Sequence, residues 1–477
     1  MGFFPYSGEG NSPRFGDFEA QRHWMELTFN LPINEWYVPS SRNEVGYWGI
    51  DYPPLTAYHE LVMGYISHLY EPSSVELFSS RGYETLTHRQ FVRLSVLISE
   101  ILTYFPAAYF VSSALRSGRW SKYFTFLALV LSPCLIFVDH GHFQYNAVPL
   151  GFLLGATGCV LRGKPLWSAF LFTCAFMFKQ TLLYFSPIFF AFMLGEALER
   201  RSILGILVRL TKLALVVIGT IAAHIFPFIA RCADVDCVKH QLWNILIRIF
   251  PFDRGVFEDY VANFWIVISP VIKLRAASRE NLRLIGISST WLTLLGCLPV
   301  CWFLATNPRK HLFPLGLAAC SLSFYLFSWM VHEKAILLPL TAVLISIPTL
   351  VRTKNSDLVL RVTEASVLSL WRLMTYDKCA IGGLAVSVFG YHCLRNTVLS
   401  REISAGIESA HRVDHRFMSV LSIFANTIAL TGFALDVAVK PPTGLPYLWP
   451  LVISAGCFGT FFLSWFRIIH LVWYDSM

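Results

Sequence analysis

Residues 15–37 read FGDFEAQRHWMELTFNLPINEWY, and residues 46–60 read GYWGIDYPPLTAYHE. Both segments mix acidic, basic and aromatic side chains, and both are too polar to sit inside a membrane. We expect the rest of the chain to be organised around these first sixty residues, because nearly everything that follows reads as apolar helix.

The composition of the 477-residue chain is typical of a polytopic membrane protein. Hydrophobic residues make up 55% of the chain, charged residues only 14%, and the mean hydropathy is +0.54, which is well beyond the balance of a soluble protein. The formal net charge is +8, but Lys and Arg fall in short clusters between apolar runs, as membrane topology requires. We therefore predict membrane lipids, and no nucleic acid, as partners.

Apolar segments follow one another from Phe91 onward, and we count about thirteen that can span a bilayer under a loose ~20-residue criterion. They lie near residues 91–115, 122–138, 145–162, 165–180, 182–197, 203–228, 284–305, 312–330, 334–350, 358–374, 380–394, 417–438 and 446–473. The sequence thus predicts an all-α membrane protein with four parts. These are a polar loop with amphipathic helices (1–90), a first helix group (91–228), a second loop (229–283) and a second helix group (284–477).

The basic connections between these segments predict the topology, because positively charged loops favour the cytoplasmic side. The basic connections all fall on the cytoplasmic side of the membrane if residues 229–283 form a single loop with surface or re-entrant helices. Residues 1–90, 140–146 and 332–334 then share the opposite, luminal side with that loop. Every polar motif is therefore predicted to face one compartment.

Asp17 and Asp51 are candidate functional carboxylates of the polar loop. Asp17 follows a glycine and precedes an aromatic-rich segment that is suited to a membrane surface. It is either a general base for a sugar hydroxyl or the cap of a helix. Asp51 stands among Tyr47, Trp48 and Tyr52. These aromatic rings suit a carbohydrate, or they anchor the loop at the membrane interface.

Two further segments carry polar groups at the ends of apolar runs. The turn DHGHFQYN (139–146) contains Asp139, His140 and His142, which form either a metal site or an ordinary connecting turn, and we predict no metal. Lys179 lies near a membrane boundary. It either binds a lipid phosphate or extends its amine to the lipid headgroups.

The remaining candidates lie in the second loop and in the turn VHEK (331–334). Arg254 either binds phosphate oxygens or pairs with neighbouring acids. His332 and Lys334 suit the negative charge of a polyprenyl phosphate leaving group, or they form a polar hairpin tip. Cys232 and Cys237 form a disulfide if their loop faces an oxidising compartment, or else they stay free thiols.

Six motifs, in this order and spacing, resemble the eukaryotic endoplasmic-reticulum glucosyltransferases that use dolichyl phosphate glucose. They are GDFEAQRHW, YWGIDYPPLTAYH, SRGYE, GHFQYN, FPFDRGVFEDYVANFW and VHEK. The resemblance runs from about residue 6 to about residue 350, whereas the C-terminal quarter matches mainly in hydropathy. The first and fifth motifs are similar to the enzyme that adds the first glucose rather than to its sister that adds the second.

This resemblance implies a GT-C fold in the endoplasmic-reticulum membrane, with its active site in the lumen. The implied reaction moves glucose from dolichyl phosphate β-glucose to the nine-mannose, dolichyl-diphosphate-linked oligosaccharide in α-1,3 linkage, with inversion and without a metal or other cofactor. Family members usually carry a further transmembrane helix before the motif-bearing loop. We expect a span or a cleaved leader upstream of this loop here; the alternative is translocation driven by the following span.

The resemblance also implies roles for individual residues. The family's base is the Asp of GDFEAQRHW, here Asp17, and a single inverting displacement fits one base. Asp51 and His332 are expected to contact the acceptor or the phosphate. The other residues expected to bind substrate are Glu19, Arg22, His142, Lys179, Arg254 and Lys334. The alternatives are the sister enzyme and a non-catalytic binder or transporter of lipid phosphates.

Overall fold

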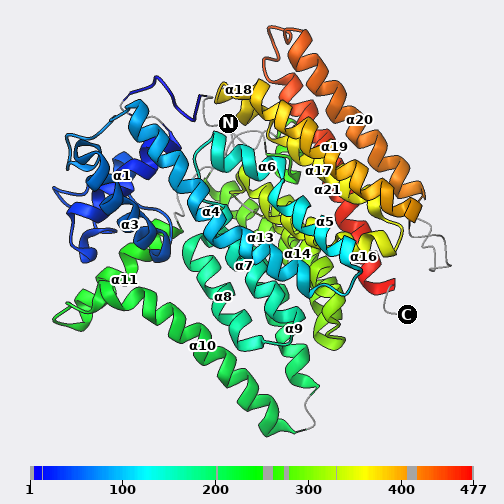
Figure 1. Cartoon of the computed structure of the whole chain (residues 1–477), viewed down its shortest axis with the longest axis horizontal. Helices are drawn as coiled ribbons and strands as arrows, with labels where there is room; N and C mark the ends of the chain where they lie inside the picture. Colours follow the sequence, from blue (N-terminus) through cyan, green and yellow to red (C-terminus); the bar gives the residue numbers. More distant parts are fainter. Residues whose placement is uncertain are drawn as a thin grey trace.

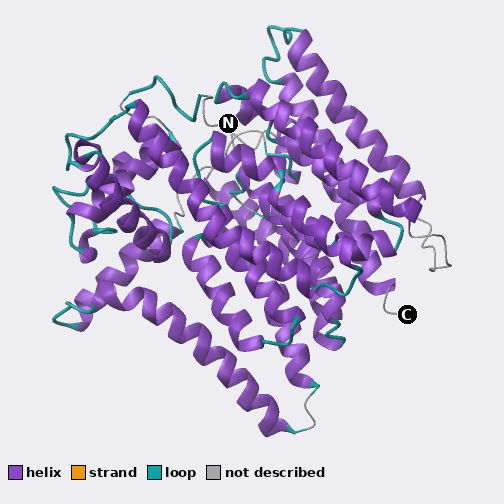
Figure 2. Cartoon of the chain, in the orientation of Figure 1, coloured by secondary structure: helices purple, strands orange, loops and turns teal. Residues whose placement is uncertain are grey.

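The computed structural model describes residues 5–12, 14, 16–199, 202–250, 261–272, 279–328, 330–404 and 416–474. These residues form helices and connecting loops without a β-strand (Figure 2), which confirms the all-α prediction for this part of the chain. The helices are α1 (Asp17–Asn30), α2 (Val45–Trp48), α3 (Pro54–Tyr70), α4 (Leu86–Ala114), α5 (Arg119–Val130), α6 (Pro133–Ile136), α7 (Ala147–Leu161), α8 (Pro165–Phe178), α9 (Ser186–Leu198), α10 (Ile203–Ile229), α11 (Val235–Ile249), α12 (Phe264–Ile272), α13 (Arg279–Thr306), α14 (Phe313–Phe327), α15 (Leu337–Ile345), α16 (Ile347–Arg352), α17 (Ser356–Ser369), α18 (Trp371–Tyr376), α19 (Ala380–Ser404), α20 (Arg416–Ala438) and α21 (Leu448–Tyr474).

Seven helical segments of the described residues are long and apolar enough to cross a membrane, so the chain is a multi-pass membrane protein. They are Leu86–Ala114, Arg119–Gly141, Gln180–Leu198, Ile203–Ile229, Leu282–Thr306, Phe417–Ala438 and Leu448–Tyr474. The bounds of α10, α20 and α21 agree with the predicted segments to within a few residues. The predicted segment 358–374, in contrast, breaks into α17 and α18.

Helix α4 connects the two ends of the bundle. Its 29 residues extend for about 43 Å, at ~1.5 Å per residue, which exceeds the ~30 Å of a bilayer's hydrocarbon core. Thr85 caps the start of the helix, because its hydroxyl accepts a hydrogen bond from the His88 amide. Its last turn reaches Arg116, Lys310 and Arg352, which line one small pocket. The basic connections therefore gather at this end, as positive-inside topology requires.

The N-terminal helices lie at the opposite end of α4. Figure 1 shows α1 and α3 beside α11, while α17, α19 and α20 lie on the far side of the bundle. Phe228, near the end of α10, packs its ring against Trp36, Tyr37 and Tyr58, with centroids 5.5–5.9 Å apart. This aromatic cluster attaches the N-terminal helices to α10.

The connection from α10 to α11 is closed by a disulfide between Cys232 and Cys237. Of the two possibilities that the sequence left open for these cysteines, the structure has the disulfide. The next helix is held to the N-terminal segment, because Arg248 on α11 donates to the carbonyls of Gly49 and Ile50 at 2.6 and 3.1 Å.

Helix α1 is enclosed by protein. Every residue from Phe18 to Thr28 is buried, and Trp24 and Leu27 belong to a core cluster that also contains Trp36. The expectation that this segment lies on a membrane surface is therefore wrong, since its apolar residues pack against other parts of the chain. A polar helix tolerates such burial only if its charged groups are paired internally.

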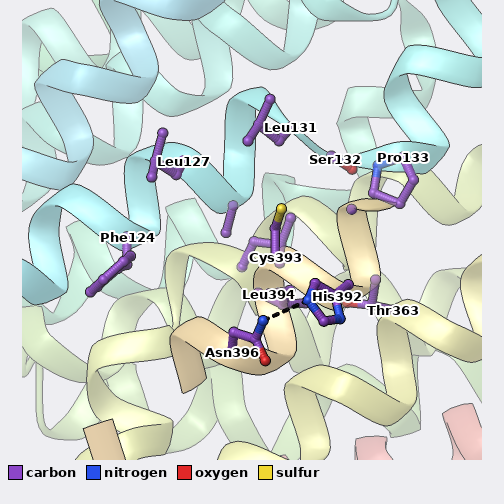
Figure 3. Close-up of a pocket in the computed structure, with 13 residues that line it drawn as sticks. Phe124, Leu127, Leu131, Ser132, Pro133, Thr363, His392, Cys393, Leu394 and Asn396 are labelled. Carbon is purple, nitrogen blue, oxygen red and sulfur yellow. Dashed lines mark hydrogen bonds between the residues drawn. The ribbon is translucent and has the colours of Figure 1, made fainter. Parts of the chain in front are cut away.

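A cavity of about 310 Å³ lies elsewhere in the bundle, between α5 and α19 (Figure 3). Phe124 and Leu127 from α5 and Leu131, the next residue after this helix, line it together with His392 and Asn396 from α19, whose side chains hydrogen-bond at 2.8 Å. None of the predicted site residues lines this cavity. The candidate site must therefore be sought at the start of α1.

Candidate active site

Asp17 is the first residue of α1, and its position depends on the glycine before it. Gly16 has φ +61°, and a Cβ atom at this residue would lie 2.6 Å from the hydroxyl of Ser7. Only glycine fits both the conformation and the space. The N-cap residue is Gly16, and no side chain caps the helix. The alternative interpretation of Asp17 as a cap is therefore wrong.

The carboxylate of Asp17 is held through one of its two oxygens. Gln144 Nε2, His142 Nε2 and Lys334 Nζ lie 2.5, 2.9 and 3.0 Å from Oδ2. No group among the described residues donates to Oδ1, and the side chain keeps 24% of its surface exposed. One oxygen is thus fixed in place by three groups, while the other receives no donor from the described residues, and the side chain stays partly exposed.

The turn after η3 (Phe137–Gly141) presents two of these groups together. Phe143 adopts a φ of +72°, which is costly for a bulky residue. Its buried ring packs against Phe18 and Tyr6, with centroids 5.2 and 5.5 Å apart. This packing stabilises the strained conformation, and the side chains on either side of Phe143, His142 and Gln144, both reach Asp17.

Opposite charges in this cluster stabilise one another, although its two cations, with Lys334 Nζ 3.0 Å from His142 Nε2, oppose each other. Burial alone would raise the pKa of Asp17, but Lys334 and His142 outweigh it and hold that pKa well below its usual value. Burial and Lys334 oppose protonation of His142, yet the carboxylates of Asp17 and Asp377 outweigh both and raise its pKa to about 9. Lys334 likewise has a raised pKa because Asp17 and Glu333 more than offset its burial. At neutral pH, therefore, an ionised carboxylate faces two cations.

Two residues of this cluster were not selected from the sequence. Gln144 stands in a motif that we quoted, but an amide gives no sign of its partner. Asp377 follows α18 in the C-terminal quarter, and its Oδ2 lies 2.6 Å from Nδ1 of His142. A single acid in a short connection carries no sequence signal for this contact.

The other predicted residues lie at different distances from Asp17. Lys179 donates to Asn146 at 2.6 Å and to Gln144 at 3.2 Å, so one amide connects it to Asp17. The carbonyl of Asp51 accepts from Gln180, the residue after Lys179, at 3.2 Å. His332 immediately precedes η7 (Glu333–Ile336), the turn that carries Lys334. The structure thus brings together residues from three distant motifs, and Lys179 joins them through Gln144.

Glu19 and Arg22 are not part of this cluster, although we expected them to bind substrate. Both side chains are fully buried. Arg22 donates to both oxygens of Glu19 at 2.6 and 2.8 Å and to Glu26 at 2.7 Å. Its remaining nitrogen donates to Ser80 at 2.5 Å. In the structure, Glu19 and Arg22 therefore pair with other residues inside the protein and have a structural role.

The three candidate metal ligands of the 139–146 turn point to different partners. Asp139 accepts from the side chain of Asn146 at 2.7 Å, and His140 lies 2.7 Å from Glu100. His142, as described, bridges two carboxylates. The side chains therefore do not converge on one point. Arg254, the last of the predicted phosphate ligands, lies outside the described residues.

This arrangement suits proton abstraction next to an anion. A general base must be ionised and within reach of the proton that it takes. Asp17 is ionised, and no described residue donates to its Oδ1. Lys334 and His142 supply positive charge beside it, which stabilises a phosphate as its negative charge grows.

Comparisons with known proteins agree with this chemistry. The model of the ALG6, ALG8 glycosyltransferase family matches residues 11–468. A relative from Gallus gallus, named dolichyl pyrophosphate Man9GlcNAc2 alpha-1,3-glucosyltransferase, is 36% identical over 98% of this chain and 92% of its own length. The protein of the same name from Saccharomyces cerevisiae is 36% identical over 98% of this chain and 88% of its own. A relative from Arabidopsis thaliana, named as a probable enzyme of this kind, is 35% identical over 98% and 86%. The predicted family is thus confirmed: the chain belongs to the ALG6, ALG8 glycosyltransferase family.

Proposed function

We propose that this chain transfers glucose from dolichyl phosphate β-glucose to the nine-mannose, dolichyl-diphosphate-linked oligosaccharide, and forms an α-1,3 bond. The relatives' names support this acceptor and this linkage. The proposal includes a GT-C architecture with about thirteen spans, the four-part division at residues 90, 228 and 283, and an active site on the luminal side of the endoplasmic-reticulum membrane.

The observation that carries the proposal is the carboxylate of Asp17, fixed through Oδ2 and open at Oδ1. In the proposed reaction, Oδ1 takes the proton of the acceptor hydroxyl while the acceptor oxygen bonds to C1 of glucose. The bond from C1 to the phosphate oxygen breaks, and its electron pair leaves with dolichyl phosphate. Because attack and departure occur on opposite faces of the ring, a β-linked donor gives an α-linked product.

The phosphate side of the site is assigned to the cations around Asp17. Lys334 lies 3.0 Å from the base, and Lys179 is connected to it through Gln144. We assign the leaving phosphate to these two amines and to His332, and the acceptor to the Asp51 loop. A compact ammonium suits a phosphate because its charge is localised.

The first experiment is transfer by the purified protein in EDTA. Dolichyl phosphate glucose is supplied with the nine-mannose lipid-linked acceptor or with its monoglucosylated form, and the released glycan is weighed by mass spectrometry. A gain of one hexose on the nine-mannose acceptor supports the proposal. Transfer to the monoglucosylated acceptor alone would instead identify the sister activity, and binding without transfer would identify a lipid-phosphate binder.

The base is tested separately with Asp17→Asn, which keeps the size of the side chain but cannot take a proton. Turnover should fall about 10²- to 10⁴-fold, the range for loss of a general base. The control is Lys310→Met, which removes a cation that lies with Arg116 at the other end of the bundle. A folded Asp17→Asn protein with near-normal turnover would refute the assignment of the base.

A further inference from the structure

Asp377 belongs to the part of the chain that no motif connected with the site. Its side chain is 0% exposed, and its Oδ2 lies 2.6 Å from Nδ1 of His142, which is 235 residues earlier in the sequence. A buried carboxylate is costly unless it is paired. Among the described residues, His142 is the only side-chain hydrogen-bond partner of Asp377.

The two nitrogens of His142 connect two carboxylates. Nδ1 contacts Asp377, while Nε2 lies 2.9 Å from Oδ2 of Asp17. The hydrogen bond at one ring nitrogen determines the direction and the protonation of the other. Without Asp377, the ring of His142 is free to turn about its side-chain bonds, and Nε2 is no longer directed at Asp17.

The connection that carries Asp377 is itself held in place. The amide of Asp377 donates to Leu373 at 3.0 Å, and that of Cys379 donates to Met374 at 2.9 Å. The thiol of Cys379 also lies 2.8 Å from the carbonyl of Pro5. The first two bonds close the turn between α18 and α19, and the third attaches it to the N-terminal segment that precedes Asp17.

We propose that Asp377 is a positioning residue of the transferase, which orients His142 so that Asp17 keeps one oxygen fixed and the other open to the acceptor hydroxyl. The inference rests on the proposed function, because it takes Asp17 as the base. It assigns a place in the site to the C-terminal helices, which the sequence motifs leave out.

The test compares Asp377→Asn with Glu364→Gln. Both substitutions neutralise one acid of the second helix group, but Glu364 on α17 hydrogen-bonds to Asn426 instead, at 2.8 Å. Asp377→Asn should lower kcat about 10- to 100-fold, as loss of an orienting partner typically does, with little change in KM. Glu364→Gln should leave kcat unchanged.

The pH profile separates positioning from a merely structural effect. The charged groups that face His142 are Asp17, Lys334 and Asp377, and loss of an acidic neighbour lowers the pKa of a histidine. The alkaline fall of kcat in Asp377→Asn should therefore begin about one to three pH units lower than in the wild type. A smaller kcat with an unmoved profile would overturn the proposal, as would a wild-type kcat.

A double substitution tests whether Asp377 acts through His142. In a His142→Gln background, Asp377→Asn should cause no further loss of kcat, because the orienting group then has nothing to orient. An additional fall in that background would refute the inference, and this arm still decides if the single Asp377→Asn variant does not fold. Near-normal turnover of Asp17→Asn would refute the base assignment itself, which is a distinct outcome.

Discussion

Two ionic clusters occupy the same helix, one turn apart, and they differ in how completely their polar atoms are paired. In the Arg22 network, formed by Glu19, Arg22, Glu26, Tyr47 and Ser80, the side chains are buried and their partners come from residues 19–82. In the Asp17 cluster, formed by Asp17, His142, Gln144, Lys334 and Asp377, the described residues leave one oxygen of Asp17 without a donor, and the partners come from three distant segments.

This difference shows that charged residues of one motif can have different roles, one stabilising the fold and the other keeping a group reactive. A buried ion pair with all its hydrogen bonds formed holds the protein together, and breaking it is costly. A carboxylate with an unpaired oxygen beside cations retains the capacity to react. Each of the following experiments should affect one cluster and spare the other.

The largest change in stability should come from Arg22→Met, which is similar in size but removes the charge. Glu19 and Glu26 would then face each other without a cation, which costs about 3–5 kcal/mol when a buried pair is broken. Thermal unfolding of the detergent-purified protein at a fixed scan rate measures this loss. Arg81→Met is the control, because Arg81 pairs with the exposed Glu44, and such surface pairs contribute only about 0–1 kcal/mol. An unchanged unfolding temperature for Arg22→Met would contradict the comparison.

The largest change in activity outside Asp17 itself should come from Lys334→Met. This variant loses a donor to Asp17 and a cation at the phosphate side. Removing one such preorganised donor typically lowers kcat about 10²- to 10³-fold. The unfolding temperature should change less than in Arg22→Met, because the side chain of Lys334 is 15% exposed whereas that of Arg22 is 0% exposed. The comparison is weakened if Lys334→Met unfolds as readily as Arg22→Met.

The two clusters should also lose their function at opposite ends of the pH range: the Asp17 cluster should lose activity at high pH, and the Arg22 network should lose stability at low pH. His142 is protonated below its pKa of about 9, so its contact with Asp17 is present below that pH and is lost as the pH rises through it. Burial alone would raise the pKa of Glu26, but the hydrogen bond with His23 and the charge of Arg22 outweigh it and lower that pKa from 4.5 to about 2. Its contribution to stability is present above 4.5 and is lost as the pH falls toward 2. Turnover should therefore decline above pH 9, and unfolding temperature should decline below pH 4.5. A parallel decline of both quantities at one end would show that the clusters are not separate.

The smallest effect should come from Tyr47→Phe, which removes the 2.8 Å hydrogen bond from the phenol to Glu19. Glu19 keeps its bonds to Arg22 and to the Gly82 amide, so the expected loss is about 1–2 kcal/mol. The kcat of the folded protein should stay at the wild-type value, as measured by glucose transfer per folded molecule. A kcat below half of that value, with a normal unfolding temperature, would place Tyr47 in the active cluster instead.

Much of the fold was predictable from the sequence, because hydropathy alone identifies long apolar helices. The spacing of motifs also led to Asp17, His142 and Lys334, which do meet in the structure. Glu19 and Arg22 were assigned to substrate because a sequence cannot show that neighbouring charges are already paired with each other. Asp377 was missed because its partner is 235 residues away.

The order of synthesis gives the Asp17 cluster a property that the Arg22 network lacks. Asp17 and Lys334 are separated by 317 residues, and a ribosome that adds ~5–20 residues per second needs roughly 15–60 s to make that stretch. The Arg22 network has all its members soon after α4 begins. Asp17 must wait until the chain is more than two-thirds complete, and Asp377 comes later still. A nascent chain that stalls before residue 334 therefore lacks the amine that donates to Asp17.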